Sequence, residues 1–291
     1  MFSVTNESRQ YETYILSDQA AQSVIEVVPE RGGIVTRWQV QNHTIFYMDE
    51  ERFTHPELTV RGGIPILFPI CGNLPNDTYT YGSASYTLKQ HGFARNLPWQ
   101  VIRQHNDSAA SLTVSLASTA ETLASYPFEF LVEFTYELQG TTLTINQRYT
   151  NCSSSPMPFS AGLHPYFWVG DKTGLQVNLP ATQFYDQASK TQGEFTGTFD
   201  FDQPEIDAAF RPLTGSSATV TDLARQLTLT LTWAEHFTTL VFWTVKGKDF
   251  YCLEPWTAPR NAMVTGDDLL HLPAGESLDT SVRLTVTLGV Q

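Results

Sequence analysis

Strict alternation of apolar and polar residues is the feature that most constrains how this chain can fold. A period of two places apolar side chains on one face of a strand and Thr, Ser or Asn on the other, which is typical of antiparallel strands packed on a core. The alternation is clearest at residues 111–118, 141–150, 227–233 and 281–290. The pattern predicts an all-β fold, mostly antiparallel, with less than about a fifth of the residues in helices.

Signals for helices and for domain boundaries are sparse. Two short stretches, residues 119–127 and 221–226, have some helical character. No Pro- or Gly-rich linker, composition break or repeat of about 20–50 residues divides the chain. Because sandwiches and barrels often reach this length as one unit, we expect residues 1–291 to form a single domain.

Charge and cysteine content exclude several classes of protein. The formal net charge of −13 argues against nucleic acid and against an anionic membrane surface, both of which attract basic proteins. The three cysteines, Cys71, Cys152 and Cys252, have no CxxC spacing and no histidine at ligand spacing, which favours reduced thiols and no metal site. Neither a signal peptide nor a run of about 20 apolar residues is present. We therefore expect a cytoplasmic protein without a membrane segment.

Four segments break the alternation and are expected to form loops or strand ends that carry chemistry. They are RGGIPILFPICGN, KQHGFARNLPW, SAGLHPYFWV and CLEPWTAPRNA, at residues 61–73, 89–99, 160–169 and 252–262. Their ionisable residues, with one more from the segment EIDAAF, are Arg61, His91, Arg95, His164, Glu254 and Asp207. Imidazoles, carboxylates and guanidiniums together are suited to general acid–base chemistry with a clamp for an anion or a hydroxyl group.

Each of these residues also has a purely structural interpretation. His164, which precedes Pro-Tyr-Phe, could be a packed histidine, and Arg61 and Arg95 could form internal ion pairs. Glu254 lies between Leu and Pro-Trp, where desolvation should raise the pKa of its carboxyl group as a base working near neutral pH requires. An exposed glutamate would fit the same sequence.

The four segments also occur, in order, in a known family. RGGIPILFP, QHGFARNLPW, GLHPYF and LEPWTAPRNA resemble signature segments of the aldose 1-epimerase superfamily, most closely of its glucose-6-phosphate 1-epimerase branch. The resemblance spans essentially the full chain. It implies a galactose-mutarotase-like β-supersandwich with a sugar cleft and with no metal or organic cofactor.

The resemblance also implies a role for each matching residue. His164 matches the general acid and Glu254 the general base, whereas His91, Arg61 and Asp207 match residues that hold the oxygens of the sugar. Exchange of anomers requires removal of the proton on the C1 hydroxyl group and protonation of the ring oxygen. One carboxylate and one imidazolium, on opposite sides of the anomeric centre, are sufficient for this.

The substrate is less well defined than the reaction. A hexose 6-phosphate needs two or three cationic donors at one end of the cleft, and Arg61, Lys89 and Arg95 flank the cleft-forming motifs. The branch has a phosphate-binding lysine a few residues before the HGFAR-type segment, and Lys89 lies near that position with its register shifted. The alternatives are an epimerase of free glucose or galactose and a non-catalytic sugar-binding module. Aromatic residues at positions 93, 168 and 256 are candidates for the walls of the cleft.

Overall fold

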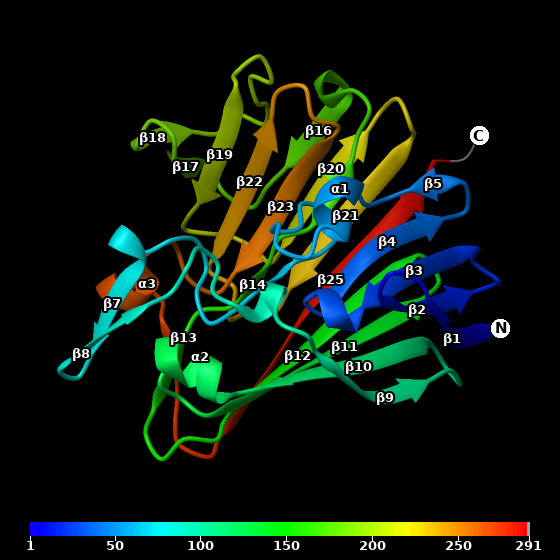
Figure 1. Ribbon diagram of the computed structural model, residues 1–291. Coiled ribbons are helices and arrows are strands. Elements are labelled where there is room, and N and C mark those ends of the chain that lie inside the picture. Colours follow the sequence, from blue (N-terminus) through cyan, green and yellow to red (C-terminus); the bar gives the residue numbers. More distant parts are fainter. Residues whose placement is uncertain (290–291) are drawn as a thin grey trace.

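A computed structural model describes residues 1–289, and antiparallel strands dominate it (Figure 1). About 51% of the chain is strand and 9% is helix, which confirms the predicted all-β class with little helix. Every strand pair between named strands in the described residues is antiparallel. No helix in the described part of the chain is long and apolar enough to cross a membrane.

One large sheet contains the four strongly alternating runs. Its strands, in spatial order, are β16 (Leu175–Asn178), β20 (Ser217–Asp222), β21 (Leu227–Trp233), β25 (Ser277–Leu288), β12 (Thr142–Asn151), β11 (Phe130–Gln139), β10 (Ala110–Ala117) and β9 (Gln100–His105). Buried and partly exposed residues alternate along β11, β12 and β21, as the period of two predicted. The exposed partners are mostly Thr and charged residues, so this sheet has one face on the core and one towards solvent.

A second large sheet carries most of the segments that break the alternation. It comprises β18 (Thr191–Glu194), β17 (Gln183–Asp186), β19 (Glu205–Phe210), β22 (Thr239–Val245), β23 (Phe250–Trp256), β14 (Gly162–Leu163) and β6 (Ile66–Leu67), with β15 (Tyr166–Trp168) paired to β23. All seven residues of β23 are buried, whereas its neighbour β22 is partly exposed. The centre of this sheet is therefore covered on both faces, which explains why its sequence does not alternate.

The remaining elements are short. A five-stranded sheet at the N-terminus contains β1 (Phe2–Ser8), β2 (Glu12–Asp18), β3 (Ser23–Val28), β4 (Ile34–Val40) and β5 (His43–Thr44). Two-stranded sheets pair β7 (Thr78–Tyr81) with β8 (Ala84–Thr87) and β13 (Met157–Phe159) with β24 (Leu270–Leu272). The helices are α1 (Glu50–Thr54), α2 (Ala120–Ser125), α3 (Ala262–Thr265), η1 (Pro29–Arg31), η2 (Pro75–Asp77), η3 (Ala94–Asn96) and η4 (Lys172–Gly174).

The two stretches with helical character have different outcomes. The first forms α2, where Thr119 caps the helix and the Thr122 hydroxyl oxygen accepts a hydrogen bond from the backbone N–H of Thr119. The second, residues 221–226, forms the end of β20 and a turn into β21. The backbone N–H of Arg225 donates a hydrogen bond to the Asp222 side-chain oxygen Oδ1 in this turn. This bond stabilises a tight hairpin between β20 and β21 in place of a helix.

The main core is continuous from the first sheet to the last. One cluster of buried side chains runs from Leu16 to Val286 and includes residues of all three larger sheets. Phe68 lies at its centre, where its ring contacts the rings of Phe130 and Tyr149 from the alternating sheet. This continuity supports the proposal that the chain forms one domain.

Candidate active site

A cavity of about 370 Å³ brings together residues that are widely separated in sequence. Of the seven predicted site residues, the six that line it are Arg61, His91, Arg95, His164, Asp207 and Glu254. They come from the segments 61–73, 89–99, 160–169 and 252–262 and from β19. The grouping is a property of the fold, since only His91 and Arg95, four positions apart, are near one another in sequence.

The register of the second large sheet explains how Asp207 and Glu254 reach the same cavity. Asp207 on β19 is paired with Trp243 on β22, and Trp243 is paired with Cys252 on β23. Directly opposed residues in an antiparallel sheet point to the same face. Glu254 is two positions after Cys252 and therefore shares that face. The segment with Glu254 was expected to be a loop or strand end, but Glu254 lies within β23, the fully buried strand.

His164 lies between two short strands that pair with β23. Gly162 in β14 is paired with Trp256, and Tyr166 in β15 is paired with Cys252, so the intervening residues cross above Glu254. The ring of His164 stacks on the ring of Tyr166, with centroids 4.8 Å apart and planes inclined by 13°. The backbone N–H of His164 donates to the Pro65 carbonyl oxygen at 3.1 Å. These contacts fix the orientation of the imidazole.

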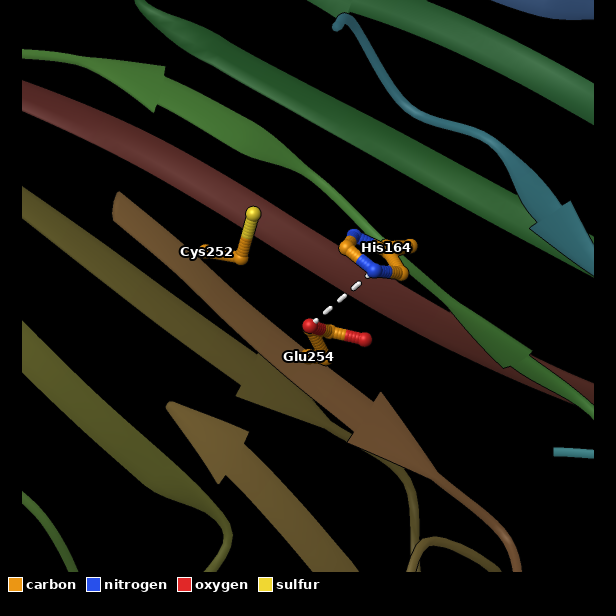
Figure 2. A group of neighbouring side chains, drawn as sticks. All are labelled: His164, Cys252 and Glu254. Atoms are coloured by element: carbon orange, nitrogen blue, oxygen red, sulfur yellow. Dashed lines mark ion pairs between the residues drawn. The ribbon is translucent and has the colours of Figure 1, made fainter. Parts of the chain in front are cut away.

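His164 and Glu254 are in direct contact, as the dashed line in Figure 2 shows. His164 Nε2 and Glu254 Oε1 are 3.3 Å apart, and the two residues are 8% and 1% exposed. Burial lowers the pKa of the His164 imidazole to about 3, and it raises the pKa of the Glu254 carboxyl group well above its usual range. Burial therefore favours a neutral pair that holds one proton on the carboxyl group.

The other carboxylate oxygen of Glu254 has its own partner. Trp256 Nε1 donates to Glu254 Oε2 at 3.2 Å, and the two residues share one face of β23. This bond leaves Oε1, the oxygen that faces His164, free to exchange a proton. The acid and base candidates, which the sequence-based interpretation placed on opposite sides of the anomeric centre, are thus in direct contact.

His91 has a defined tautomer in this site. Its Nδ1 accepts a hydrogen bond from the backbone N–H of Gly72 at 3.1 Å, so a neutral ring carries its proton on Nε2. Burial, reinforced by Arg95 and His164, lowers the pKa of His91 well below that of free histidine. His91 Nε2 lies 3.3 Å from the side-chain amide nitrogen of Gln90, which also lines the cavity, and a neutral imidazole with a proton on Nε2 is suited to donate a hydrogen bond to a sugar oxygen.

Arginine supplies the positive charge of the cavity. Arg260 Nη2 donates to Asp207 Oδ2 at 2.7 Å, while the guanidinium of Arg61 lies 5.9 Å from the ring centroid of Trp243. Arg95 donates to the backbone carbonyl oxygen of Gln90 at 2.9 Å. Within residues 1–289, no carboxylate forms an ion pair with Arg61 or Arg95. Their charge is thus available to a ligand.

Lys89, the seventh predicted residue, does not line this cavity. Its side chain is 80% exposed, and Nζ is 2.8 Å from Asp77 Oδ2. Among the aromatic candidates, Trp256 lines the cavity, whereas the ring of Phe93 stacks on Phe130 next to the core and Trp168 lies beneath Arg225. The motif that contains Lys89 therefore reaches the site through His91 and Arg95.

Several lining residues were not identified from the sequence. They are Arg52, Thr59, Val60, Gln90, Tyr166, Glu205, Trp243 and Arg260. Arg260 and Tyr166 lie in segments already singled out, so a closer examination of those segments could have found them. Trp243 has no local signal, because only the pairing of β19 with β22 brings it to the cavity, whereas Glu205 lies in the segment EIDAAF that also contains Asp207.

Cys252 adds a third potential metal ligand to the pair formed by His164 and Glu254. Figure 2 shows Cys252 and Glu254 on the same strand, with His164 beside them, and their ligand atoms all lie within 4.8 Å of one another. A thiolate, an imidazole and a carboxylate could hold zinc. In the absence of a metal, burial raises the pKa of the Cys252 thiol well above its usual value, so the free thiol stays protonated. That the site takes no metal stays a prediction.

Comparison with known proteins identifies the family. A model of the aldose 1-epimerase family matches residues 14–285. The chain belongs to the aldose 1-epimerase family. This epimerase is therefore a sugar isomerase, a mutarotase, that acts on a small-molecule sugar.

Two relatives with described sequences are 27% and 30% identical to the epimerase. The LacX protein of Lactococcus lactis subsp. lactis is 27% identical over 76% of the epimerase and 83% of LacX. A protein of Cenchrus ciliaris, provisionally named a glucose-6-phosphate 1-epimerase, is 30% identical over 57% of the epimerase and 50% of that protein.

Solved structures confirm the predicted galactose-mutarotase-like fold. Slr1438 from Synechocystis sp. PCC 6803 is 42% identical, with a TM-score of 0.95 over 99% of the epimerase and 100% of Slr1438. Galactose 1-epimerase from Lactobacillus acidophilus NCFM is 16% identical, with a TM-score of 0.76 over 100% of the epimerase and 99% of that chain. At 16% identity, the likeness to the Lactobacillus acidophilus protein concerns the fold alone.

Proposed function

We propose that the epimerase interconverts the α and β anomers of a hexose 6-phosphate, with Glu254 as general base and His164 as general acid. One observation carries the proposal: a buried carboxylate–imidazole pair shares its cavity with Arg61 and Arg95, which have no carboxylate partner within residues 1–289. The pair is suited to proton transfer at an anomeric centre. The two arginines are suited to a phosphate group.

The contact between His164 and Glu254 fits the geometry of a hemiacetal. The hydroxyl oxygen O1 and the ring oxygen O5 are both bonded to C1, so the atoms that exchange protons with them must also lie close together. Glu254 Oε1 and His164 Nε2, 3.3 Å apart, meet this requirement. A base and an acid far apart in the cavity would not.

The protons and electrons balance without another reactant. Glu254 removes the proton from the O1 hydroxyl group as the C1–O1 bond becomes a carbonyl, the C1–O5 bond breaks, and His164 protonates O5. Rotation about C1–C2 and the reverse transfers close the ring on the other face. The reacting form is the charged pair, which is reached from the neutral pair by transfer of the proton from Glu254 to His164, and ring opening returns the pair to the neutral form that burial favours.

The remaining polar residues are placed to hold the hydroxyl groups of the sugar. His91 presents Nε2–H, whereas Asp207 keeps one carboxylate oxygen on Arg260 and leaves the other, Oδ1, buried without a partner in the structure. An unpaired buried oxygen costs folding free energy. A sugar hydroxyl group donating to Asp207 Oδ1 would remove that cost on binding.

The phosphate group is assigned to Arg61 and Arg95. The name of the Cenchrus ciliaris protein points to the same substrate, although the match covers only part of each chain. Arg61 is exposed and Arg95 is half-buried, and both line the cavity. Arg61 would therefore attract the phosphate group from solvent, and Arg95 would contact it once the sugar is bound. Each charge-assisted contact is worth about 1.5–3 kcal/mol.

Substrate preference tests the assignment. NMR exchange rates give kcat/KM for glucose 6-phosphate and for glucose, and we expect the wild type to favour the phosphosugar. Arg95→Ala should lower kcat/KM for glucose 6-phosphate by about 10- to 150-fold, with a much smaller effect on glucose. Lys89→Ala is the matched control, because this neighbouring cation lies outside the cavity. Equal kcat/KM values of the wild type for glucose 6-phosphate and glucose would instead favour an epimerase of free aldoses.

The same assay separates catalysis from simple sugar binding. A binding module on this fold could retain Arg61 and the aromatic walls without an acid–base pair. If the wild type binds sugars but leaves their rate of anomer exchange at the level of buffer, the catalytic roles of His164 and Glu254 are wrong.

A further inference from the structure

One surface loop, residues 50–60, forms part of the wall of the proposed active site; it is called the α1 loop below because it begins with that helix. Three of its residues line the cavity: Arg52, Thr59 and Val60. Its two ends meet, because the backbone N–H of Asp49 donates to the carbonyl oxygen of Arg61 at 2.9 Å. A loop closed in this way leaves its middle to be held by other contacts.

The helical part of the α1 loop has little support of its own. None of the five residues of α1 is buried. The ring of Phe53 packs on Tyr11, with centroids 5.6 Å apart, and Gln10 Nε2 donates to the carbonyl oxygen of Thr54 at 2.6 Å. The last carbonyl oxygens of a helix have no partner inside the helix. Those of Arg52 and Phe53 therefore need donors from elsewhere in the fold.

A buried arginine outside the cavity supplies these donors. Arg31, the last residue of η1, is 7% exposed, and its guanidinium donates to four carbonyl oxygens of the α1 loop. Nε donates to Phe53 at 3.2 Å, and Nη2 donates to Arg52, His55 and Leu58 at 3.2, 2.8 and 2.6 Å. Within residues 1–289, no carboxylate forms an ion pair with Arg31. The carbonyl dipoles of one loop thus take the place of a counter-ion.

The cavity residue that this arrangement positions is Arg52. Its backbone is bound by Arg31, and its side chain lines the same cavity as Arg61. Nη1 donates to the carbonyl oxygen of Thr59 at 3.3 Å, whereas the ion pair with Asp49 is long, with 3.9 Å between Nε and Oδ2. The side chain is 34% exposed. Arg52 therefore presents a positive charge that a ligand in the cavity can reach.

We propose that Arg31 is a positioning residue for substrate recognition, which holds the α1 loop so that Arg52 contacts the phosphate group of the sugar. Arg52 would then be the third cationic donor, a role that the sequence-based interpretation gave to Lys89. The proposal rests on the proposed function for its phosphosugar substrate. Arg31 does not line the cavity, so it acts only through the loop. Its planar guanidinium reaches several carbonyl oxygens at fixed angles, which the single ammonium group of a lysine cannot do.

A double-mutant cycle tests whether Arg31 acts through Arg52. The ligand is 1,5-anhydroglucitol 6-phosphate, which has no O1 and cannot open its ring, and calorimetry gives its dissociation constant. Arg52→Gln should weaken binding by about 5- to 20-fold, and Arg31→Lys by about three- to tenfold. In the Arg52→Gln background, Arg31→Lys should change binding by less than about twofold, because the contact that it disturbs is already absent.

Kinetics with glucose 6-phosphate separate recognition from chemistry. KM should rise in parallel with the dissociation constant in Arg31→Lys, while kcat stays within about twofold, since His164 and Glu254 are unchanged. A residue that only stabilised the fold would not divide its effect in this way. Urea unfolding shows that each variant is folded under the conditions of the assay.

Arg225 provides the matched control. Its side chain is 15% exposed and donates to the carbonyl oxygens of Thr44 and Trp168, but it does not line the cavity. Arg225→Lys should lower stability and leave binding within about twofold in both backgrounds. If Arg31→Lys does not fold, Gln10→Ala takes its place in the cycle, because this exposed residue holds the same loop through Thr54.

The outcomes separate this inference from the proposed function. Unchanged binding in Arg31→Lys (or in Gln10→Ala in its place), or effects that add to those of Arg52→Gln, would overturn the role of Arg31 and leave the proposed function standing. A wild type that binds 1,5-anhydroglucitol as tightly as its 6-phosphate would refute the phosphosugar substrate and the role of Arg52 together. Coupled effects on binding in a protein that exchanges no anomers would refute the proposed reaction and support the role of Arg31.

Discussion

At the scale of single residues, the site depends on where burial places one proton. Glu254 and His164 are both buried, and each is harder to charge than in water, so the pair holds its proton away from bulk solvent. The hydrogen bond from Trp256 orients the Glu254 carboxyl group, and stacking on Tyr166 orients the His164 ring. Neither group would have this property at the surface.

Substitution of either member of the pair should remove catalysis and retain binding. We expect Glu254→Gln and His164→Asn each to slow anomer exchange by at least about 10²-fold, because each removes a proton transfer made in the transition state. Sugar affinity, measured by calorimetry, should change much less. Near-normal exchange in one of these variants would show that the residue has another role.

The pH dependence of the reaction should also differ from that of an ordinary histidine. A second proton would have to enter on His164, whose pKa is lowered to about 3, so kcat/KM for glucose should stay level between about pH 5 and pH 7. The single proton of the pair is lost as the pH rises through the raised pKa of Glu254, and activity should fall there. Glucose is the substrate of choice because it has no phosphate that titrates. An acidic limb with a midpoint near 6.5 would contradict this assignment.

At the scale of elements, a few close backbone approaches hold the site segments together. Gly63 has a φ of 56°, and a Cβ atom there would lie 2.0 Å from the carbonyl oxygen of Val35 on β4. Its own backbone accepts a hydrogen bond from Tyr166 and donates one to Tyr47. Gly63 therefore connects the N-terminal sheet with the strand that follows His164.

Gly63→Ala should therefore be costly. We expect it to lower the free energy of unfolding by about 2 kcal/mol or more, because the backbone must move as well as adopt a strained φ. Gly82→Ala is the matched control: φ is 61°, but no atom lies within 4 Å of the added Cβ, so about 1 kcal/mol is expected. Urea unfolding measures both. Equal losses of unfolding free energy in the two variants would show that the close contact with Val35 does not add to the cost of the Gly63 substitution.

At the scale of the whole molecule, the proposed hexose 6-phosphate is an anion that must approach a negatively charged protein. The formal net charge is −13, so a hexose 6-phosphate is repelled until Arg61 and Arg95 act on it locally. Screening by salt weakens the attraction at the exposed mouth of the cavity. The kcat/KM ratio of glucose 6-phosphate to glucose should therefore fall between low and high ionic strength. A ratio that is independent of salt would argue against a phosphate contact at these arginines.

Much of this protein is determined by local sequence. The period of two at residues 111–118 or 227–233 can be satisfied only by a strand with one face on a core, so the all-β class followed directly. The residue types around His164 and Glu254 suggested acid–base chemistry, and the resemblance of their motifs to the aldose 1-epimerase superfamily implied the two roles, which stay predictions.

Only the tertiary structure decided which residues meet. Lys89 and Arg95 are six positions apart, yet Lys89 turns to Asp77 and Arg95 faces the cavity. The pairing of β19, β22 and β23 brings Asp207 and Glu254 onto one face, and a shift of one residue would point them to opposite faces. Register between distant strands is fixed by the packing of the whole core, and no local pattern encodes it.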